Sequence, residues 1–262
     1  MADVPARPLA RLCHRRGGGT LPGVGTSSDT SDLKPSWIRV VDRASVAAFV
    51  VVWAAVGFQL LATHPPTRLV LLGIAALIPA VLLADLVSGL VHWFADRYLD
   101  PATPVLGPML IEPFREHHRD PQAMARHDFF EVSGNNGLVT LPLAAGLLVL
   151  DTSPGDPLWS QLARVATVLF ALALFVTNQL HAWAHAPAPP GWVRRLQRAQ
   201  VILSPQAHAL HHAHGYDRAY CVTTGWLNPW LDRAGTFAAL EALLARAGLE
   251  LATQARREGR TR

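Results

Sequence analysis

The sequence predicts an all-α fold: an integral membrane four-helix bundle with a helical cap on its cytoplasmic side. Three observations carry this prediction. Half of the 262 residues are hydrophobic and only 16% are charged, whereas about a quarter of an ordinary soluble domain is charged. Four apolar stretches follow one another along the chain, and the cationic side chains gather on one side of them. A bundle of four spans fits a chain of this length.

Residues 1–36 precede the first apolar stretch and are rich in Arg, Gly, Ser, Thr and Pro. Arg15 and Arg16 are followed by glycines instead of the apolar run that a signal peptide requires. We therefore expect residues 1–36 to be a disordered basic tail. Residues 37–240 are expected to form the membrane domain, and residues 241–262 a C-terminal helix and basic tail.

The four apolar stretches lie at residues 44–62, 69–91, 137–150 and 158–180. A membrane span needs about 20 apolar residues, so the third stretch, with 14 residues, is short. The topology requires this stretch to cross as well, by extending backward or by tilting little. A later apolar pattern at residues 236–247 has helical spacing, and packing on the cap is favoured over lying on the membrane.

Cationic side chains orient the bundle. Seven precede the first span, four lie between the second and third spans, and more follow the fourth, whereas the two remaining turns carry one and none. By the positive-inside rule, both termini and the central loop are cytoplasmic. A basic balance also occurs in nucleic-acid-binding proteins, but in an apolar chain it favours contact with anionic lipid. No nucleic-acid partner is expected.

Histidine is the unusual residue of this chain. Ten of the twelve histidines fall between residues 85 and 214, and only His14 and His64 stand apart. The predicted topology places all ten at one membrane face. The two cysteines, Cys13 and Cys221, form no CxxC pair, so a disulfide framework, thiol chemistry and a zinc finger lack support.

The second span ends in a polar stripe. Asp85, His92 and Asp96 are separated by seven and four residues, so they share one helix face. An Asp inside an apolar span usually faces the bundle interior and a partner. Asp85 either bonds to neighbouring backbone or Arg97, or it supports a metal ligand. His92 on the same stripe favours the supporting role, which we also assign to Asp96.

The fourth span ends with His181 and His185. Their i, i+4 spacing lets two imidazoles meet one metal ion, although this spacing alone is a weak signal. Asn178 precedes His181 by three residues and is a candidate to bond a ligand ring or a bound water.

A denser cluster follows this span, because His208, His211 and His212 fall within five residues. Imidazole is a poor core filler and is uncommon at this density on a surface, so the pattern indicates metal binding. His214 is interpreted as a spare or supporting group.

The central loop carries the remaining histidines. His117 and His118 are adjacent and point in different directions on a helix, so one can serve one metal ion and its neighbour a second. His127, followed by Asp128 and Glu131, offers another imidazole and two carboxylates.

Seven to nine imidazoles therefore converge with few carboxylates. One zinc ion needs three or four ligands, and the sequence contains no HExxH motif of the zinc proteases. An excess of neutral nitrogen ligands suits two transition-metal ions, and iron is the choice for oxygen chemistry. The cap is thus predicted to carry a histidine-rich metal site, with di-iron favoured. Such a site can abstract hydrogen from an unactivated C–H bond at the lipid boundary.

Several motifs together resemble the plasmanylethanolamine desaturase family, the CarF- and Kua-like lipid desaturases. They cover about residues 40–240. The motifs are D-L-x-S-G-L-x-H-W at residues 85–93, F-R-E-H-H-x-D-P at 114–121, R-H-D-F at 126–129, N-Q-x-H-x-W-x-H at 178–185, H-x-x-H-H at 208–212 and Y-C-x-T-T-G-W-L-N at 220–228.

The resemblance implies an iron site formed by nine histidines, which are His92, His117, His118, His127, His181, His185, His208, His211 and His212. All of them except His127 are also expected to be catalytic. The residues expected to support them are Asp85, Asp96, Asn178, Asp128 and His214. One departure concerns the animal members, which read H-H-x-x-H-H where this chain has Ala207 in place of the first His. His214 is a candidate to compensate.

The activity that the resemblance implies is 1,2-desaturation of the alkyl ether chain of a phospholipid, from plasmanylethanolamine to plasmalogen. It would use two iron ions, O2 and a separate electron-transfer protein, cytochrome b5-like or ferredoxin-like, since the sequence shows no haem, flavin or iron–sulfur motif. The expected location is the cytoplasmic membrane if the source is bacterial. Three alternatives remain: a plant-type acyl-lipid desaturase acting on phosphatidylglycerol, a di-iron lipid hydroxylase, and a non-catalytic metal-binding membrane protein.

Overall fold

The computed structural model describes residues 34–150, 153–213, 215–249 and 251–252. Within this part of the chain all regular secondary structure is helical, as the sequence predicts. Most of the predicted basic tail (residues 1–36), the end of the C-terminal tail and His214 lie outside the described residues.

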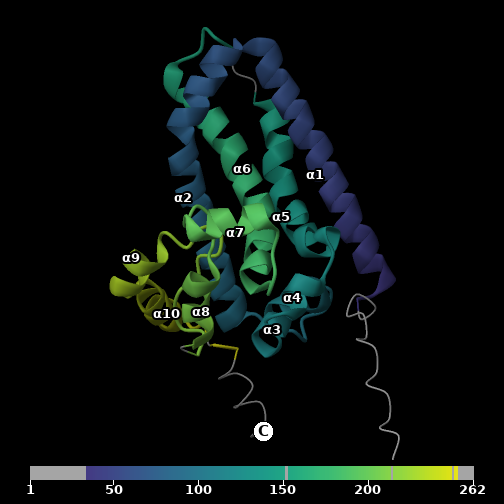
Figure 1. The fold of residues 1–262 in the computed structure, drawn as a ribbon, viewed down its shortest axis with the longest axis vertical. Coiled ribbons are helices and arrows are strands. Elements are labelled where there is room, and N and C mark those ends of the chain that lie inside the picture. The colour runs from purple at the N-terminus through teal and green to yellow at the C-terminus, as the bar shows by residue number, and fades with distance from the viewer. Residues whose placement is uncertain (1–33, 151–152, 214, 250, 253–262) are drawn as a thin grey trace, which may run out of the picture.

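Four long helices form the bundle in Figure 1, and each is long and apolar enough to cross a membrane. They are α1 (Ser36–Thr63), α2 (Pro66–Tyr98), α5 (Phe129–Val149) and α6 (Leu158–His185). Helix α1 packs against α5, α5 against α6, and α6 against α2. The four predicted spans are therefore confirmed, and the architecture fits a multi-pass membrane protein.

Helix α5 contains the short third stretch and extends it backward to Phe129. Its N-terminus is fixed by a capping box, in which the Asp128 carboxylate accepts a hydrogen bond from the Glu131 backbone N–H at 2.9 Å. At 1.5 Å per residue its 21 residues measure ~31 Å, close to the thickness of the hydrocarbon core. The extension is what makes this segment long enough to span.

The outer faces of α1 and α2 are apolar. Val51, Phe58 and Ile74 keep 68%, 73% and 69% of their surface exposed. Exposed apolar surface of this extent on two neighbouring helices is unfavourable in water and favourable against lipid tails. Inside the bundle, Phe49 of α1 stacks on Phe175 of α6 with ring centroids 4.1 Å apart.

Short helices form the cap at one end of the bundle, where α2 ends, α5 begins and α6 ends (Figure 1). Those between α2 and α5 are the π-helical segment η2 (Gly107–Ile111), α3 (Glu112–Arg119) and α4 (Ala123–Arg126). Those after α6 are α7 (Gly191–Arg198), α8 (Pro205–Ala213), α9 (Asn228–Arg233) and α10 (Thr236–Arg246). The predicted helical cap is therefore present.

Helix α10 packs on the cap, as favoured from its sequence pattern. Phe237 lies in a cluster with Trp93 of α2 and Tyr220. Arg97 of α2 donates hydrogen bonds to both carboxylate oxygens of Glu241, at 2.7 and 3.1 Å. These contacts hold α10 against the end of α2.

Gly89 allows the backbone segment formed by residues 219–228, hereafter the 219–228 segment, to approach α2 closely. A Cβ atom at Gly89 would lie 2.6 Å from the Cys221 Sγ and 3.2 Å from its backbone nitrogen. Gly89→Ala is expected to lower the free energy of unfolding by about 1–3 kcal/mol, because the added carbon overpacks this contact. Thermal unfolding in detergent would measure the loss.

Gly73→Ala is the matched control for that measurement. Gly73 lies on the same helix, and a Cβ there would meet no heavy atom within 4 Å. This variant is expected to be as stable as the wild type, or more stable by up to about 1 kcal/mol from helix propensity. Equal losses in both variants would contradict the close-approach explanation.

Candidate metal centre

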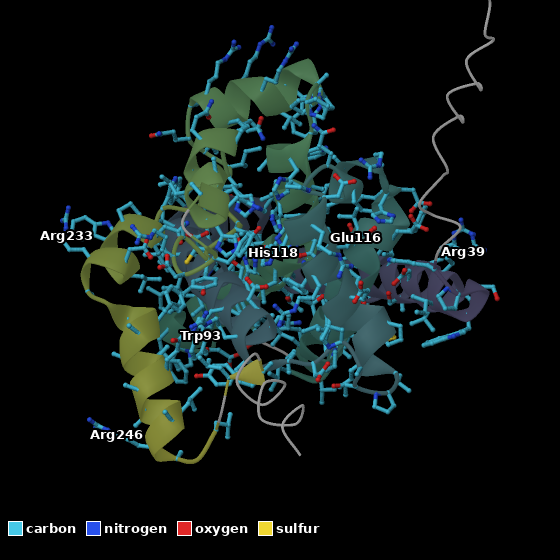
Figure 2. All side chains as sticks on the ribbon, turned by 90° about the horizontal axis from the view of Figure 1, so that it is seen from below. Arg39, Trp93, Glu116, His118, Arg233 and Arg246 are labelled. Atoms are coloured by element: carbon cyan, nitrogen blue, oxygen red, sulfur yellow. The ribbon has the colours of Figure 1, made fainter. Side chains whose placement is uncertain are left out.

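Histidine side chains from four helices meet at the cap end of the bundle. Helix α2 contributes His92, α3 contributes a pair, the end of α6 contributes a pair, and α8 contributes three. Viewed from below, His118 lies near the centre of the molecule, while Arg39, Arg233 and Arg246 lie toward its rim (Figure 2). The sequence prediction that these histidine clusters share one face of the bundle is confirmed by this convergence.

The imidazoles form two overlapping groups. The first, called the α2-side group, consists of His92, His117, His118 and His211. The second, called the α6-side group, consists of His117, His185, His208 and His212. Within each group, one ligating atom per residue lies within 4.8 Å of every other. His117 belongs to both groups and lies between them.

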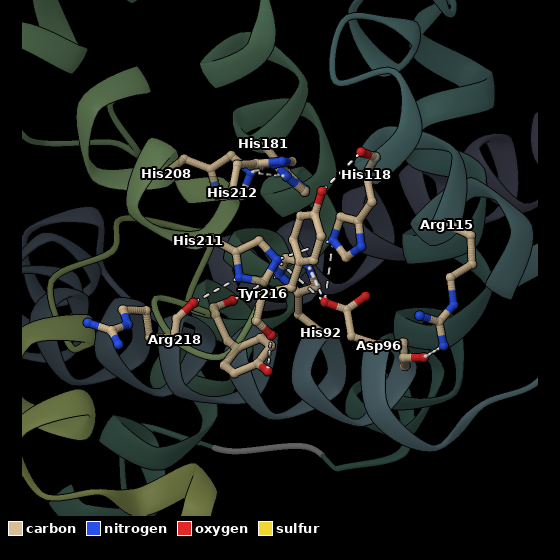
Figure 3. Close-up of polar contacts among 12 residues, drawn as sticks. His92, Asp96, Arg115, His118, His181, His208, His211, His212, Tyr216 and Arg218 are labelled. Atoms are coloured by element: carbon tan, nitrogen blue, oxygen red, sulfur yellow. Dashed lines mark hydrogen bonds and ion pairs between the residues drawn. The ribbon is translucent and has the colours of Figure 1, made fainter. Parts of the chain in front are cut away.

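Asp96 places a carboxylate oxygen inside the α2-side group. Its Oδ2 lies 3.3 Å from the Nε2 of His92, 3.5 Å from that of His118 and 3.4 Å from that of His211 (Figure 3). From its sequence position Asp96 is expected only to support the ligands. The structure instead puts its oxygen as close to the centre of the group as the nitrogens are.

The nitrogens of the α6-side group converge closely. The Nε2 of His208 lies 2.9 Å from that of His185 and 3.1 Å from that of His212. His181 adjoins this group, with its Nε2 2.8 Å from that of His208 and 3.2 Å from that of His185. One nitrogen carries at most one proton, so hydrogen bonds alone cannot satisfy three neighbouring lone pairs.

Backbone carbonyls fix how two rings of the α2-side group point. The Nδ1 of His92 donates to the Tyr220 carbonyl at 3.1 Å, and the Nδ1 of His211 donates to the Arg218 carbonyl at 2.8 Å. With the proton held on Nδ1, each Nε2 presents its lone pair to the group. This is how the outer nitrogen of a metal-binding histidine is normally held.

Burial favours the neutral form of four cap histidines. It lowers the pKa of His117 and of His208 well below the usual value for histidine, and neighbouring imidazoles lower both further. Burial, with a smaller contribution from the nearby His211, lowers the pKa of His118 to about 2 and that of His212 to about 4. Neutral imidazole is the form that binds metal.

The donor set fits two metal ions. The Nε2 atoms of His92 and His117 are buried and have no hydrogen-bond partner among the described residues. Metal–nitrogen bonds of about 2.1 Å place neighbouring ligands about 3.0 Å apart at right angles. The observed nitrogen separations of 2.8–3.2 Å match that spacing. An excess of imidazole over carboxylate suits transition metals such as iron or zinc in preference to magnesium or calcium.

His127 and Asp128, which the sequence proposed for the site, lie outside both groups and have other partners. His127 makes two contacts with carboxylates, through Nδ1 to Glu131 Oε2 at 3.0 Å and through Nε2 to Glu116 Oε2 at 3.5 Å. Asp128 is the N-cap of α5. A third, His214, falls outside the described residues.

Asp85 bonds to backbone, which was one of the two interpretations of its sequence position. Its carboxylate accepts hydrogen bonds from the N–H groups of Thr224, Gly225 and Leu227, at 2.8, 2.9 and 3.1 Å. These residues belong to the 219–228 segment, whose Tyr220 carbonyl holds His92. Asp85 therefore acts on the α2-side group through this segment.

Two features of the site were not singled out from the sequence. Tyr216 stacks on the His118 ring with centroids 4.0 Å apart, and its hydroxyl donates to the His118 carbonyl at 3.1 Å. The carbonyls of Arg218 and Tyr220 orient two rings, a role that belongs to the backbone and leaves no trace in residue type. The uncharged motif at residues 220–228 was the only available signal.

Ala207 occupies the position where the sequence departs from the animal pattern. It packs against an apolar cluster formed by Ala184, Leu203 and Val222. Neither histidine group includes this position, so both groups assemble without a histidine there.

Comparison with known proteins gives one consistent family. Residues 81–250 match the lipid desaturase domain family. The chain is 41% identical over 209 residues to the plasmanylethanolamine desaturase of Myxococcus xanthus, covering 79% of this chain and 72% of that protein. It is 43% identical over 189 residues to plasmanylethanolamine desaturase 1 of Mus musculus, covering 71% and 68%.

A plant protein is also similar. Fatty acid desaturase 4 of the Arabidopsis thaliana chloroplast is 36% identical over 162 residues, covering 61% of this chain and 48% of that protein. No solved structure matches the chain.

Proposed function

The chain belongs to the lipid desaturase family, and from this premise we propose that it is a di-iron enzyme that uses O2 to convert the alkyl ether chain of a phospholipid to a vinyl ether. The observation that carries this proposal is the pair of buried histidine groups at the end of a membrane bundle, with Asp96 among their nitrogens. The proposed substrate is plasmanylethanolamine and the product a plasmalogen, because two relatives bear that name.

The proposed ligands are the α2-side group with Asp96, the α6-side group, and His181 beside it. When bound there, two irons would supply the activation of O2 for removal of hydrogen from a C–H bond. The reaction balances as R–CH2–CH2–OR′ + O2 + 2 electrons + 2 protons giving R–CH=CH–OR′ + 2 H2O. Two of the four electrons that reduce O2 come from the substrate.

Burial of the histidines excludes water from the site, and backbone carbonyls orient two of the rings. His92, His117, His181, His208 and His211 are each at most 2% exposed, so bulk water is excluded from their nitrogens. Burial also strengthens every electrostatic interaction at the site. The carbonyl bonds to His92 and His211 fix the direction of two rings before metal binds.

The remaining two electrons require a separate protein, because the chain shows no haem, flavin or iron–sulfur motif. A cytochrome b5-like or ferredoxin-like carrier is the proposed donor. It is proposed to approach from the cytoplasm, since the charge distribution along the sequence favours that side for both termini and the cap. In a bacterium the membrane would be the cytoplasmic membrane.

One alternative is favoured by a specific observation, the 36% identity to the chloroplast fatty acid desaturase 4. An acyl-lipid desaturase would use the same ligands and the same balance of electrons. It would place an ester-linked chain, instead of an ether-linked one, against the histidine groups.

Lipid analysis of a host supplied with 1-O-alkylglycerol tests the function. Expression of the chain is expected to produce ether phospholipids that are lighter by two hydrogens and release an aldehyde in acid. The matched control is His185→Ala, which removes one nitrogen of the α6-side group and should abolish the product. A new double bond confined to acyl chains would establish the alternative, and an unchanged lipid profile would contradict both.

A further inference from the structure

Two pockets meet beside the histidine groups. Both are lined by Phe114 of α3 and Asn178 of α6. One, called the chain pocket, also reaches His92, and the other, called the polar pocket, reaches His117 and His181. A molecule that filled both pockets would pass Phe114 and Asn178 with histidines on either side.

The chain pocket is suited to hydrocarbon. It lies between α2, η2, α5 and α6, within the apolar part of the bundle. Besides His92 and Phe114, it is lined by six aliphatic side chains and by five Ser, Thr and Asn side chains. The aliphatic side chains include Val87, Val91, Leu110, Val139, Leu174 and Val222. The aliphatic side chains offer contact to an alkyl chain. The Ser88, Thr140 and Thr177 hydroxyls and the Asn136 amide already bond to backbone carbonyls.

The polar pocket is suited to the other end of a lipid. It lies at the cap, and its lining includes Lys34, Glu116, His127, Glu131 and Asn135. Lys34 pairs with Asp42 at 3.4 Å, and His127 contacts both glutamates. This pocket therefore offers charged and amide side chains to a glycerol and headgroup, at the end of the bundle where α5 begins.

Asn178 stands where the two pockets join, and its amide makes no hydrogen bond to any other described residue. Two neighbouring asparagines of α5 behave differently. Asn135 donates to the Met109 carbonyl at 2.7 Å, and Asn136 donates to the Leu174 carbonyl at 2.6 Å. Their amides serve helix packing, whereas the amide of Asn178 is open to the pockets. A polar side chain at an apolar boundary is unfavourable unless a partner arrives.

We propose that one phospholipid occupies both pockets, with its chain in the chain pocket, its headgroup end in the polar pocket, and the oxygen that links chain to glycerol accepting a hydrogen bond from the Asn178 amide. This inference rests on the proposed function and adds a substrate-binding residue to it. The linkage oxygen is one bond from C1 of the chain and two from C2. Fixing that oxygen at Asn178 therefore sets these carbons beside Phe114, between His92 and His181.

A substrate with its oxygen replaced tests this contact directly. Binding is measured anaerobically on the iron-loaded protein in nanodiscs, by native mass spectrometry, so that no turnover occurs. The two probes are 1-O-hexadecyl-2-acyl phosphatidylethanolamine and its analogue with CH2 in place of the linkage oxygen. Asn178→Leu keeps the shape of the side chain and removes the donor. It is expected to weaken binding of the ether lipid by about 3- to 10-fold, the value of one hydrogen bond, and to leave binding of the CH2 analogue unchanged.

Thr167→Val on the same helix is the matched control. Thr167 is half-buried, and among the described residues its hydroxyl bonds only to the Ala163 carbonyl within α6. This variant should bind both lipids like the wild type. Iron content and melting temperature, measured for every variant, should be the same.

Equal weakening of both lipids by Asn178→Leu, or no weakening of either, would overturn the proposal. So would a wild-type protein that does not distinguish the two lipids. The outcome is separate from that of the function test. Binding that depends on the linkage oxygen and on Asn178, without any new double bond in the host, would retain this inference and reject the proposed reaction.

Discussion

Replacing His117 with alanine is expected to prevent stable binding of both irons, whereas His211→Ala and His212→Ala should each disturb one. The reason is geometric, since His117 is shared by the α2-side and α6-side groups while His211 and His212 each belong to one. Loss of an outer partner of a ligand typically weakens metal binding 10- to 100-fold, and loss of a ligand itself is expected to weaken it by at least about 100-fold. Product formation should fall below detection in all three variants.

Iron counting distinguishes the shared ligand from the others. After anaerobic reconstitution and removal of loose metal, mass spectrometry should find about two irons in the wild type, about one in His211→Ala or His212→Ala, and close to none in His117→Ala. These numbers follow from two sites that share one ligand, which would bind both irons as an imidazolate, through its two ring nitrogens. Loss of only one iron from His117→Ala would contradict the sharing.

His127→Ala is the informative control for that count. The family resemblance assigns His127 to the iron site, yet the structure places it outside both groups, where it bonds to Glu131 and contacts Glu116. The variant is expected to retain both irons. Loss of an iron would restore His127 to the ligand set and show that it moves on metal binding.

The bundle could be predicted because its causes are local in the sequence. Long apolar runs require spans, and arginine counts orient them, which together bring His92, His181 and His185 to one face. The third span was the least certain part, because its first half contains Glu131, Asn135 and Asn136. Those residues lower its hydropathy, but Glu131 belongs to the capping box that starts α5.

The arrangement of the histidines depends on contacts between distant parts of the chain. Sequence spacing pairs His181 with His185, but it does not show that His118 meets His211, 93 residues away, at 3.2 Å. The sequence likewise placed Asp96 on the correct stripe of α2 without showing that three imidazoles point at it. Only the packing of α3 and α8 against α2 determines those neighbours.

The 219–228 segment shows a second reason why the site could not be fully predicted from the sequence. Its contribution comes from backbone groups. The Tyr220 carbonyl orients His92, and N–H groups of the segment, such as that of Thr224, bind Asp85. Backbone groups are the same in every residue, so the sequence could only mark Asp85 as a buried acid in need of a partner. Only the fold shows that the partner of Asp85 is backbone.

Asp85→Ala is expected to have the largest effect on stability of any single substitution outside the ligands. Asp85 is fully buried, and its carboxylate accepts three N–H bonds from the 219–228 segment. Alanine removes the partner of one buried N–H, that of Thr224, and of two half-buried ones, at about 1–3 kcal/mol each. Because the three losses are coupled, the free energy of unfolding should fall by about 3–5 kcal/mol.

The same change should weaken one iron site selectively. With the 219–228 segment released, the Tyr220 carbonyl no longer holds the Nδ1 of His92, and the α2-side group loses the preset direction of one ring. Iron affinity at that group is expected to fall 10- to 100-fold, while the α6-side group, which does not include His92, keeps its iron. Iron titration followed by thermal unfolding in detergent measures both effects.

Ser88→Ala provides the graded comparison, since Ser88 lies on the same helix and its hydroxyl oxygen accepts the Val222 N–H of the same segment at 3.2 Å. The same hydroxyl also accepts from the Thr223 hydroxyl at 3.2 Å and donates to the Asp85 carbonyl at 2.8 Å. These bonds are all neutral, so the expected loss is about 1–2 kcal/mol, smaller than that of Asp85→Ala, with both irons retained. If Asp85→Ala is no less stable than Ser88→Ala, the carboxylate does not anchor the segment. If Asp85→Ala is unstable but loads both irons with wild-type affinity, the segment is anchored by Asp85 without orienting His92, and the link from the buried acid to the metal ligand is broken.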